Sequence, residues 1–370
     1  MNRRFEVLDA FRGLCALSVV VFHMRILDSV TEIEFFRGSY IFVEFFFVLS
    51  GFVLAHSYGV KDKVNFYSFM KARFLRIYPL HFVMFSVFVI LELGKLFAYD
   101  FLGLNFNNQP FTGPFSVEEV IPNLLLIQSW TSLTYAESFN YPSWSISIEL
   151  YSYAILAISI ITFKKYRPVS WLALSLLSFF MLFSGSDIFV AQVQRGLSCF
   201  FGGAFTYVVF KKVENTDINY LLGSIIELLL ITSIFFVVQS SSEYRGIVAP
   251  LLFLITVFSF SFEFGCISKL LKIGFLQYLG RLSYSIYMTH AAVLFCLTSI
   301  SMVAGSIFSI KLTEVVEGVR FLSFGGGMIN NLVILLTVLF VVYISRFTYK
   351  FVELRGQKLF VSTKEMKGTA

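Results

Sequence analysis

The sequence predicts an all-α protein that crosses a membrane about ten times, with both termini in the cytoplasm. Of its 370 residues, 57% are hydrophobic and only 14% are charged, whereas soluble domains have about 45–50% and about 25%. The 47 Phe and 18 Tyr residues would give a soluble fold more apolar surface than its polar residues could cover. The four cysteines are scattered, so we expect no disulfide framework and no metal site.

A membrane-crossing helix needs about 20 predominantly apolar residues. Stretches of about this length occur at residues 10–27, 40–58, 77–97, 142–163, 168–185, 189–210, 219–240, 246–264, 277–304 and 328–349. The first has no small-residue cleavage site after it, so we interpret it as a retained span and not a signal peptide. A turn around Ser184–Asp187 separates the fifth and sixth stretches, which predicts a helical hairpin.

The positive residues set the expected orientation. Most of the 29 Lys and Arg residues fall on one side if the N-terminus is cytoplasmic, and residues 98–140 on the other side contain none. This follows the excess of positive charge in cytoplasmic loops. The net charge of +6 is therefore a topology signal, and we expect a lipid bilayer as partner and no nucleic acid. Three arginines, Arg12, Arg195 and Arg281, fall within spans.

The first span carries Arg12 and His23. An ionisable group within a span is costly and suggests a functional site. Eleven residues make about three helical turns, so both side chains share one face, roughly 16 Å apart along the axis. Asp9, three residues before Arg12, can pair with it. The alternative is that Arg12 anchors the helix at the interface and His23 is a buried, hydrogen-bonded histidine.

The third span is preceded by Arg73 and Arg76. Arginines at i and i+3 face one side of a helix and can hold phosphates bidentately. A simple topology anchor explains the pair equally well.

The fourth span opens with NYPSWSISIE at residues 140–149. Pro142 suits the first turn of a helix, and Asn140 or Ser143 can cap it.

Within this span, Ser145 and Glu149 lie at i and i+4 on one face, with Glu149 roughly 10 Å below the helix start. His23 is expected at a comparable depth, so Glu149 can orient His23 and stabilise its imidazolium while His23 acts as a base. The alternative is a Glu149 carboxylate stabilised by the helix dipole and nearby serine hydroxyls.

The ninth span contains LGRLSYSIYMTH at residues 279–290. Arg281 and His290 are nine residues apart, roughly 13 Å, and on opposite helix faces. The serines and tyrosines between them predict a helix that lines a cavity. We assign Glu44 to the same cavity, and the sequence gives no role to Glu227 or Glu263.

These motifs resemble the acyltransferase-3 family of integral membrane acyltransferases, which includes O-antigen and other surface-polysaccharide O-acetyltransferases. The resemblance rests on LDAFRG and FH around Arg12 and His23, VEFFFVLSGF at 43–52, RFLRIYP at 73–79, WSISIE at 144–149 and the ninth-span motif. The motifs follow one another in the family's order over nearly the whole chain.

The resemblance implies a multi-pass protein of the bacterial inner membrane. It would move an acetyl group from cytoplasmic acetyl-CoA to a hydroxyl of a cell-surface glycan, such as O-antigen or capsule, or of its lipid-linked precursor. Residues 1–360 would form one transmembrane acyltransferase domain and 361–370 a short cytoplasmic tail, without the SGNH domain that some relatives append. A homo-oligomer is left open.

The resemblance implies that Arg12, His23, Arg73 and Arg76 are required for activity, and it carries the family's fourth-span motif over to Trp144, Ser145, Ser147 and Glu149. Together with the topology and the helix spacing, this gives the expected site. The catalytic residues would be His23, Glu149, Ser147 and Ser145, and the acetyl-CoA site would contain Arg12, Arg73 and Arg76. The substrate pocket would contain Trp144, Glu44, Arg281, His290 and Asp9.

A transporter or flippase of a lipid-linked sugar or small solute is the alternative, since ten spans with intramembrane charge fit it on composition. Two features favour the enzyme: the cationic residues cluster at the cytoplasmic mouth, which suits CoA phosphates, and the sequence has no obvious internal repeat of the kind that transporters often show. It leaves open the acceptor, the length of the acyl group, and whether an acyl-enzyme forms on His23 or a serine. We expect the polar and aromatic loop at 98–140 to select the acceptor.

Overall fold

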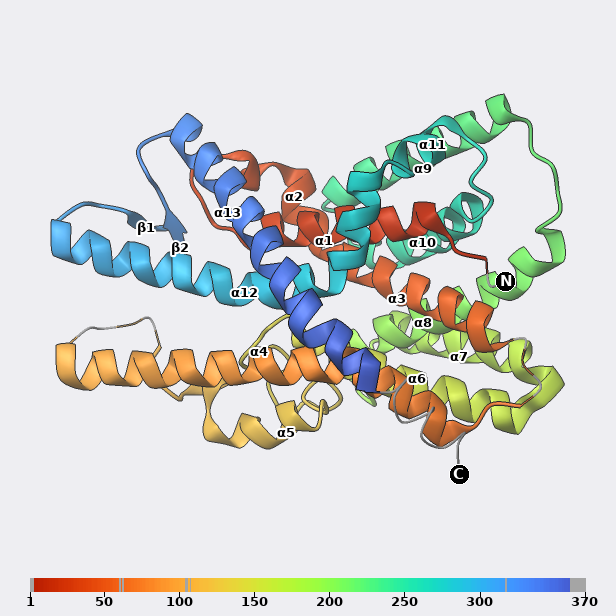
Figure 1. The fold of residues 1–370 in the computed structure, drawn as a ribbon, viewed down its shortest axis with the longest axis horizontal. Helices are drawn as coiled ribbons and strands as arrows, with labels where there is room; N and C mark the ends of the chain where they lie inside the picture. The colour runs from red at the N-terminus through yellow and green to blue at the C-terminus, as the bar shows by residue number, and fades with distance from the viewer. Residues whose placement is uncertain are drawn as a thin grey trace. The chain divides into compact units, whose positions relative to one another are not determined.

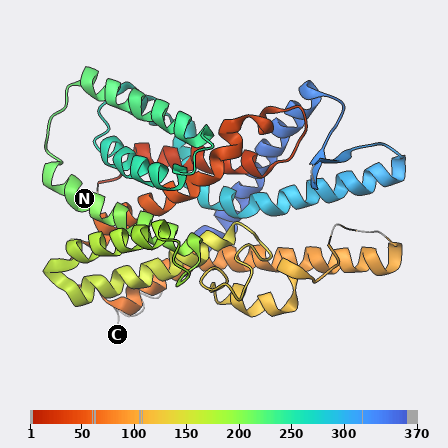
Figure 2. The same cartoon turned by 180° about the vertical axis from the view of Figure 1, so that it is seen from behind.

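A computed structural model describes residues 3–59, 61, 63–103, 106, 108–316 and 318–359, and these residues are mostly helical (Figure 1 and, from behind, Figure 2). The chain divides into two compact units. The first comprises Met1–Ser57 and Gly203–Arg346, and the second Tyr58–Gly202 and Phe347–Ala370. The predicted tail at 361–370 lies outside the described residues.

The first unit contains most of the helices and a small hairpin. Its elements are α1 (Glu6–His23), α2 (Glu34–Gly38), α3 (Phe42–Leu54), α9 (Tyr220–Gln239), α10 (Arg245–Phe260), α11 (Cys266–Leu271), α12 (Gly274–Phe308), β1 (Thr313–Val316), β2 (Val319–Leu322) and α13 (Gly327–Thr348). The two strands pair antiparallel, with Thr313 opposite Leu322. Helix α8 (Ala191–Val213) joins the two units along the chain.

The second unit is built on α4 (Phe66–Leu102), α6 (Ser143–Phe163) and α7 (Arg167–Phe183), with the short helix α5 (Val120–Leu124) in the long loop before α6. Asn65 caps α4 by accepting a hydrogen bond from Ser68 N at 2.8 Å. Helix α7 ends at Phe183, so the predicted turn at Ser184–Asp187 does join two helices, α7 and α8.

A helix lies at each of the ten predicted spans. Among the described residues, six helical segments are long and apolar enough to cross a membrane by length and composition. Helix α1 is not among them, because Glu6, Asp9 and Arg12 place three charges in its 18 residues. A multi-pass membrane protein is therefore supported, while the count of ten and the side on which the termini lie stay predictions.

Several predicted boundaries were wrong. The first span was expected to reach residue 27, but α1 ends at His23 and the backbone turns extended at Met24. The third was expected to begin at residue 77, but α4 begins at Phe66 and includes the basic residues that the hydropathy criterion had excluded. Helix α6 has Pro142 at its N-cap position and no side-chain cap, so neither Asn140 nor Ser143 caps it as predicted.

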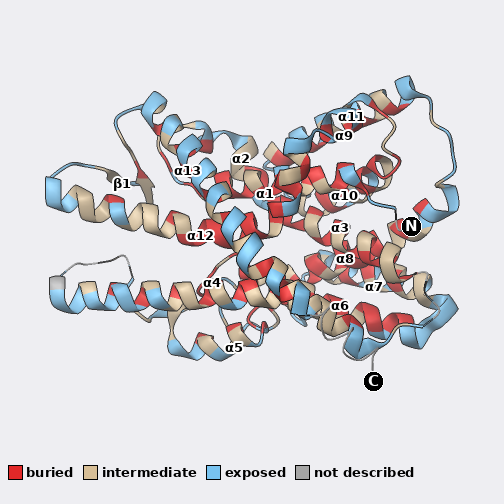
Figure 3. Cartoon of the chain, in the orientation of Figure 1, coloured by how far each residue is buried: buried red, intermediate tan, exposed pale blue. Residues whose placement is uncertain are grey.

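Several helices are exposed over much of their surface, as Figure 3 shows for α9 and α13, and the exposed residues of these two helices are mostly apolar. In α9 only Gly223, Glu227, Ile234 and Val238 are buried, while side chains such as Leu228 and Phe236 are about 60% exposed. An apolar helix that is exposed over most of its surface in the isolated chain suits a lipid environment.

Candidate active site

Two glycines let α1 and α12 approach to backbone contact in the first unit. A Cβ atom on Gly280 would lie 2.2 Å from the carbonyl oxygen of Asp9, and one on Gly13 would lie 2.7 Å from Gly280 N. Small residues at a crossing allow this approach between membrane helices. His23 follows Gly13, and His290 follows Gly280, by ten residues. Each histidine thus lies about 15 Å along its helix from the shared contact.

His23 and His290 stack on one another beyond this crossing. Their ring centroids are 5.2 Å apart, with 29° between the planes. His290 is completely buried, whereas His23 is half-buried at the last position of α1. The ring centroids of Phe22 and His23 are 4.7 Å apart, in an edge-to-face arrangement with 67° between the planes. The sequence predicted both histidines as site residues but not their stacking.

The remaining site residues of the first unit lie along α1, α3 and α12. Arg12 is half-buried in α1, Glu44 is buried in α3, and Arg281 is exposed in α12 while His290 on the same helix is buried, as their predicted opposite faces require. Ser283 and Ser285 are buried as well. The Asp9 carboxylate pairs with Arg4 at 2.8 Å, a partner before the helix that the sequence did not predict. The predicted pair of Asp9 with Arg12 stays a prediction.

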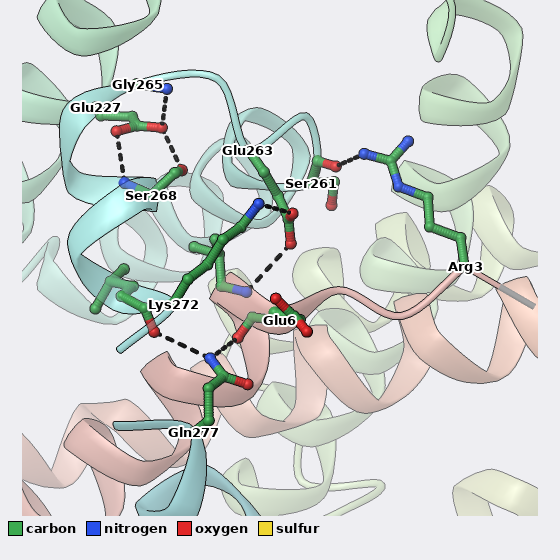
Figure 4. A network of polar contacts seen from close by, with 11 residues as sticks. Arg3, Glu6, Glu227, Ser261, Glu263, Gly265, Ser268, Lys272 and Gln277 are labelled. Carbon is green, nitrogen blue, oxygen red and sulfur yellow. Dashed lines mark hydrogen bonds and ion pairs between the residues drawn. The ribbon is translucent and has the colours of Figure 1, made fainter. Parts of the chain in front are cut away.

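The two acidic residues without a predicted role stabilise the beginning of α1 and the turn at α11 (Figure 4). Buried Glu227 accepts hydrogen bonds from Gly265 N at 2.9 Å, from Ser268 N at 3.0 Å and from the Ser268 hydroxyl. It therefore binds the backbone amides at the start of α11, which have no partner within that helix. Glu227 is a structural residue.

Glu263 connects two segments at the same end of the first unit (Figure 4). Its carboxylate accepts from Val7 N at 3.2 Å and pairs with Lys272 at 2.6 Å. Gln277 donates to the carbonyl oxygen of Glu6 at 2.7 Å. The first turn of α1 is thereby attached to the residues that lead into α12.

In the second unit, Arg73 and Arg76 lie in one helix, α4, as predicted. The Arg73 guanidinium lies 5.7 Å from the ring centroid of Tyr58, in a cation–π contact. Arg73 Nε is buried and has no hydrogen-bond acceptor among the described residues. Because an unsatisfied buried donor is costly, this atom is suited to a ligand such as a phosphate oxygen.

The loop before α6 is attached to the first turns of that helix by side-chain hydrogen bonds. The Ser147 hydroxyl donates to Leu126 O at 2.6 Å, the Ser129 hydroxyl to Trp144 O at 3.0 Å, and Trp130 Nε1 to Ser147 O at 3.3 Å. Ser147 thus holds the loop against the helix that carries Glu149. Sequence reasoning missed Trp130, whose only signal was a tryptophan in the predicted external loop.

Glu149 and Ser145 also have local partners on α6. Glu149 accepts a hydrogen bond from the Tyr153 hydroxyl, one turn further along the helix. The Ser145 hydroxyl donates to Pro142 O at 3.1 Å. Tyr153 was missed, although its i+4 spacing from Glu149 could have indicated it.

The predicted site residues divide between the two units. His23, Arg12, Glu44, His290, Arg281 and Asp9 belong to the first, and Glu149, Ser145, Ser147, Trp144, Arg73 and Arg76 to the second. The predicted pairing of His23 with Glu149 stays a prediction.

Comparisons with known proteins agree with the resemblance. The sequence model of the acyltransferase-3 family, described as an acyltransferase domain, matches residues 5–350. The chain is 39% identical over 114 residues to acyltransferase MdmB of Streptomyces mycarofaciens, covering 30% of this chain and 26% of that protein. It is 41% identical over 103 residues to protein 2 in the picA locus of Rhizobium radiobacter, covering 26% and 46%.

A longer match relates the chain to the peptidoglycan O-acetyltransferase OatA of Listeria monocytogenes, with 23% identity over 324 residues, 78% of this chain and 49% of that protein. The matches thus span half or less of the length of these relatives. No solved structure matches the chain.

Proposed function

We propose, from the premise that the chain belongs to the acyltransferase-3 family and is an acyltransferase, that it transfers an acetyl group from acetyl-CoA to a glycan hydroxyl. The acceptor would be a cell-surface glycan such as O-antigen or capsule, or its lipid-linked precursor, and the enzyme would lie in the bacterial inner membrane. The name of the Listeria relative, a peptidoglycan O-acetyltransferase, supports a glycan acceptor. Family membership favours this function over the transporter.

The observation that carries the proposal is the stack of His23 on His290. A general base must hold its ring nitrogen in one place, and a buried ring 5.2 Å away restricts the rotation of the His23 ring. His290 therefore acts as a positioning residue. In the proposed step, His23 takes the proton of the acceptor hydroxyl while the hydroxyl oxygen bonds to the thioester carbonyl carbon. The carbon–sulfur bond then breaks, and His23 returns the proton to the CoA thiolate.

Glu149 is proposed to orient His23 and to stabilise its imidazolium. The hydrogen bond that Glu149 accepts from the Tyr153 hydroxyl holds the carboxylate in place on α6. Trp144 and Ser145 would shape the pocket. Ser147 is better suited to positioning than to nucleophilic attack, because its hydroxyl is buried and donates to Leu126 O.

The acetyl-CoA phosphates are proposed to bind the arginines Arg12, Arg73 and Arg76. Planar guanidinium groups hold phosphates bidentately. The buried N–H at Nε of Arg73 has no acceptor among the described residues, so it can donate to a phosphate oxygen. Glu44, Asp9 and Arg281 would line or border the substrate pocket.

The test is acetyl transfer by membranes that contain the full chain. Membranes would receive isotope-labelled acetyl-CoA and a glycan extract, and labelled acetyl esters would be measured by mass spectrometry. His23→Ala should lower the rate by about 10²- to 10⁴-fold, the usual contribution of a general base. His56→Gln is the matched control, since His56 contacts Tyr207 and Arg3 O. Unchanged transfer by His23→Ala at equal abundance would disprove the proposal.

A further inference from the structure

The chain immediately after His23 is fixed by the β-hairpin. Leu27 N donates to Leu322 O at 3.0 Å, and Leu322 N donates to Arg25 O at 2.8 Å. Both bonds join the segment that follows α1 to strand β2. The backbone of Arg25 is therefore held two residues beyond His23, while its side chain is exposed.

A second arginine reaches the same segment from α2. Arg37 Nη2 donates to Met24 O at 2.7 Å, and Arg37 Nε donates to Thr31 O. The guanidinium also lies 5.8 Å from the ring centroid of Phe22. Its third nitrogen, Nη1, is buried and has no hydrogen-bond acceptor within the part of the chain that the structure describes.

The two arginines place positive charge beside His23. Arg25 and Arg37 both interact electrostatically with His23, and they repel one another. Glu32 attracts Arg37, but the buried Nη1 atom remains without an acceptor. Leaving a buried charged donor unsatisfied is expensive, and an anionic ligand would satisfy the donor and offset the repulsion between the two guanidinium groups.

We propose that Arg25 and Arg37 form a subsite for an anionic group, a carboxylate or a phosphate, on the hydroxyl acceptor. This inference rests on the proposed function, because it takes His23 as the base that faces the acceptor. Arg12, the arginine assigned to the donor, lies roughly 16 Å from His23 toward the start of α1. Arg25 and Arg37 lie beyond the opposite end of α1, so an anion there belongs to the acceptor.

The two sources of such an anion are a uronic acid and the phosphate of a lipid-linked sugar. Purified full-length protein in detergent, with saturating CoA to occupy the donor site, would be titrated with three probes: methyl glucuronide, glucose 1-phosphate and methyl glucoside. Binding would be followed by thermal stabilisation, and acetyl transfer to each probe would be measured separately.

The variants are Arg25→Gln, which removes the charge, and Arg37→Lys. The lysine keeps the charge but lacks the planar set of N–H donors of the guanidinium group. Each should weaken binding of the anionic probe by about tenfold or more, the effect of losing a charge-assisted hydrogen bond, and leave methyl glucoside unaffected. Lys311→Gln is the control, because Lys311 is an exposed cation next to the same hairpin and pairs with Glu314. It should bind all three probes like the wild type.

Preference for methyl glucuronide would indicate a uronic acid acceptor, and preference for glucose 1-phosphate a phosphorylated carrier; either supports the subsite. Equal binding of all three probes, or variants that bind anionic probes like the wild type, would overturn it. If His23→Ala abolishes transfer while the arginine variants change nothing, the subsite alone fails. If the anionic probes bind through Arg25 and Arg37 but the wild type never transfers acetyl, the proposed function alone fails.

Discussion

Gly280→Ala should separate α1 from α12 and disable the enzyme without removing any polar group. The new Cβ atom would lie 2.2 Å from Asp9 O, where ordinary van der Waals contact begins at 3.4 Å. The helices must therefore separate by about 1 Å, and overpacking of this kind costs about 1–3 kcal/mol. A misplacement of about 1 Å in a catalytic group can cost on the order of 100-fold in rate. The expected result is a lower melting temperature and at least that loss of turnover.

The measurements are thermal unfolding in detergent and turnover per folded molecule with acetyl-CoA and an acceptor. Gly274→Ala is the matched control, since it lies in the same helix and a Cβ atom there meets nothing within 4 Å. It should match the wild type in both measurements. Wild-type turnover and stability in Gly280→Ala would refute the reasoning that this contact sets the position of His290 against His23.

Two further substitutions separate structure from chemistry. Ser147→Ala leaves Leu126 O without its donor and should cost about 1–3 kcal/mol of stability. Turnover per folded molecule should stay within a few fold of the wild type. Abolished turnover at wild-type stability would make the serine catalytic. Glu227→Ala removes the acceptor of three hydrogen bonds and should lower the free energy of unfolding by at least about 2 kcal/mol. The expected readout is a lower melting temperature with an unchanged KM for the acceptor. A stable but inactive variant would contradict the structural role.

The sequence predicted the parts of the fold and site that depend on local periodicity. Hydropathy located the helices, and spacing placed Arg12 with His23 on α1 and Arg73 with Arg76 on α4. The hairpin β1–β2 was missed because a scan for spans of about 20 residues ignores strands of four residues. The glycine at position 318 was the turn signal in the sequence, and in the structure its φ is +78°.

Contacts between distant segments could not be predicted from one sequence. The stack of His23 on His290 depends on the register of two helices, and that register is set by Gly13 and Gly280. The role of Ser147 likewise depends on Leu126, which lies 21 residues earlier in a loop. Residue spacing within one helix predicts neither His290 as the partner of His23 nor Leu126 as the partner of Ser147.

Helix α1 is attached at both of its ends. At its beginning, Val7 N is bound to Glu263, and just beyond its end Leu27 N is bound to Leu322 O. A helix secured in this way cannot slide along its own axis as a piston without breaking one set of bonds. If His23 is the base, the proton acceptor therefore stays at one level, and both substrates must travel to it. The attachment therefore opposes a mechanism in which α1 moves and exposes His23 to the two sides in turn.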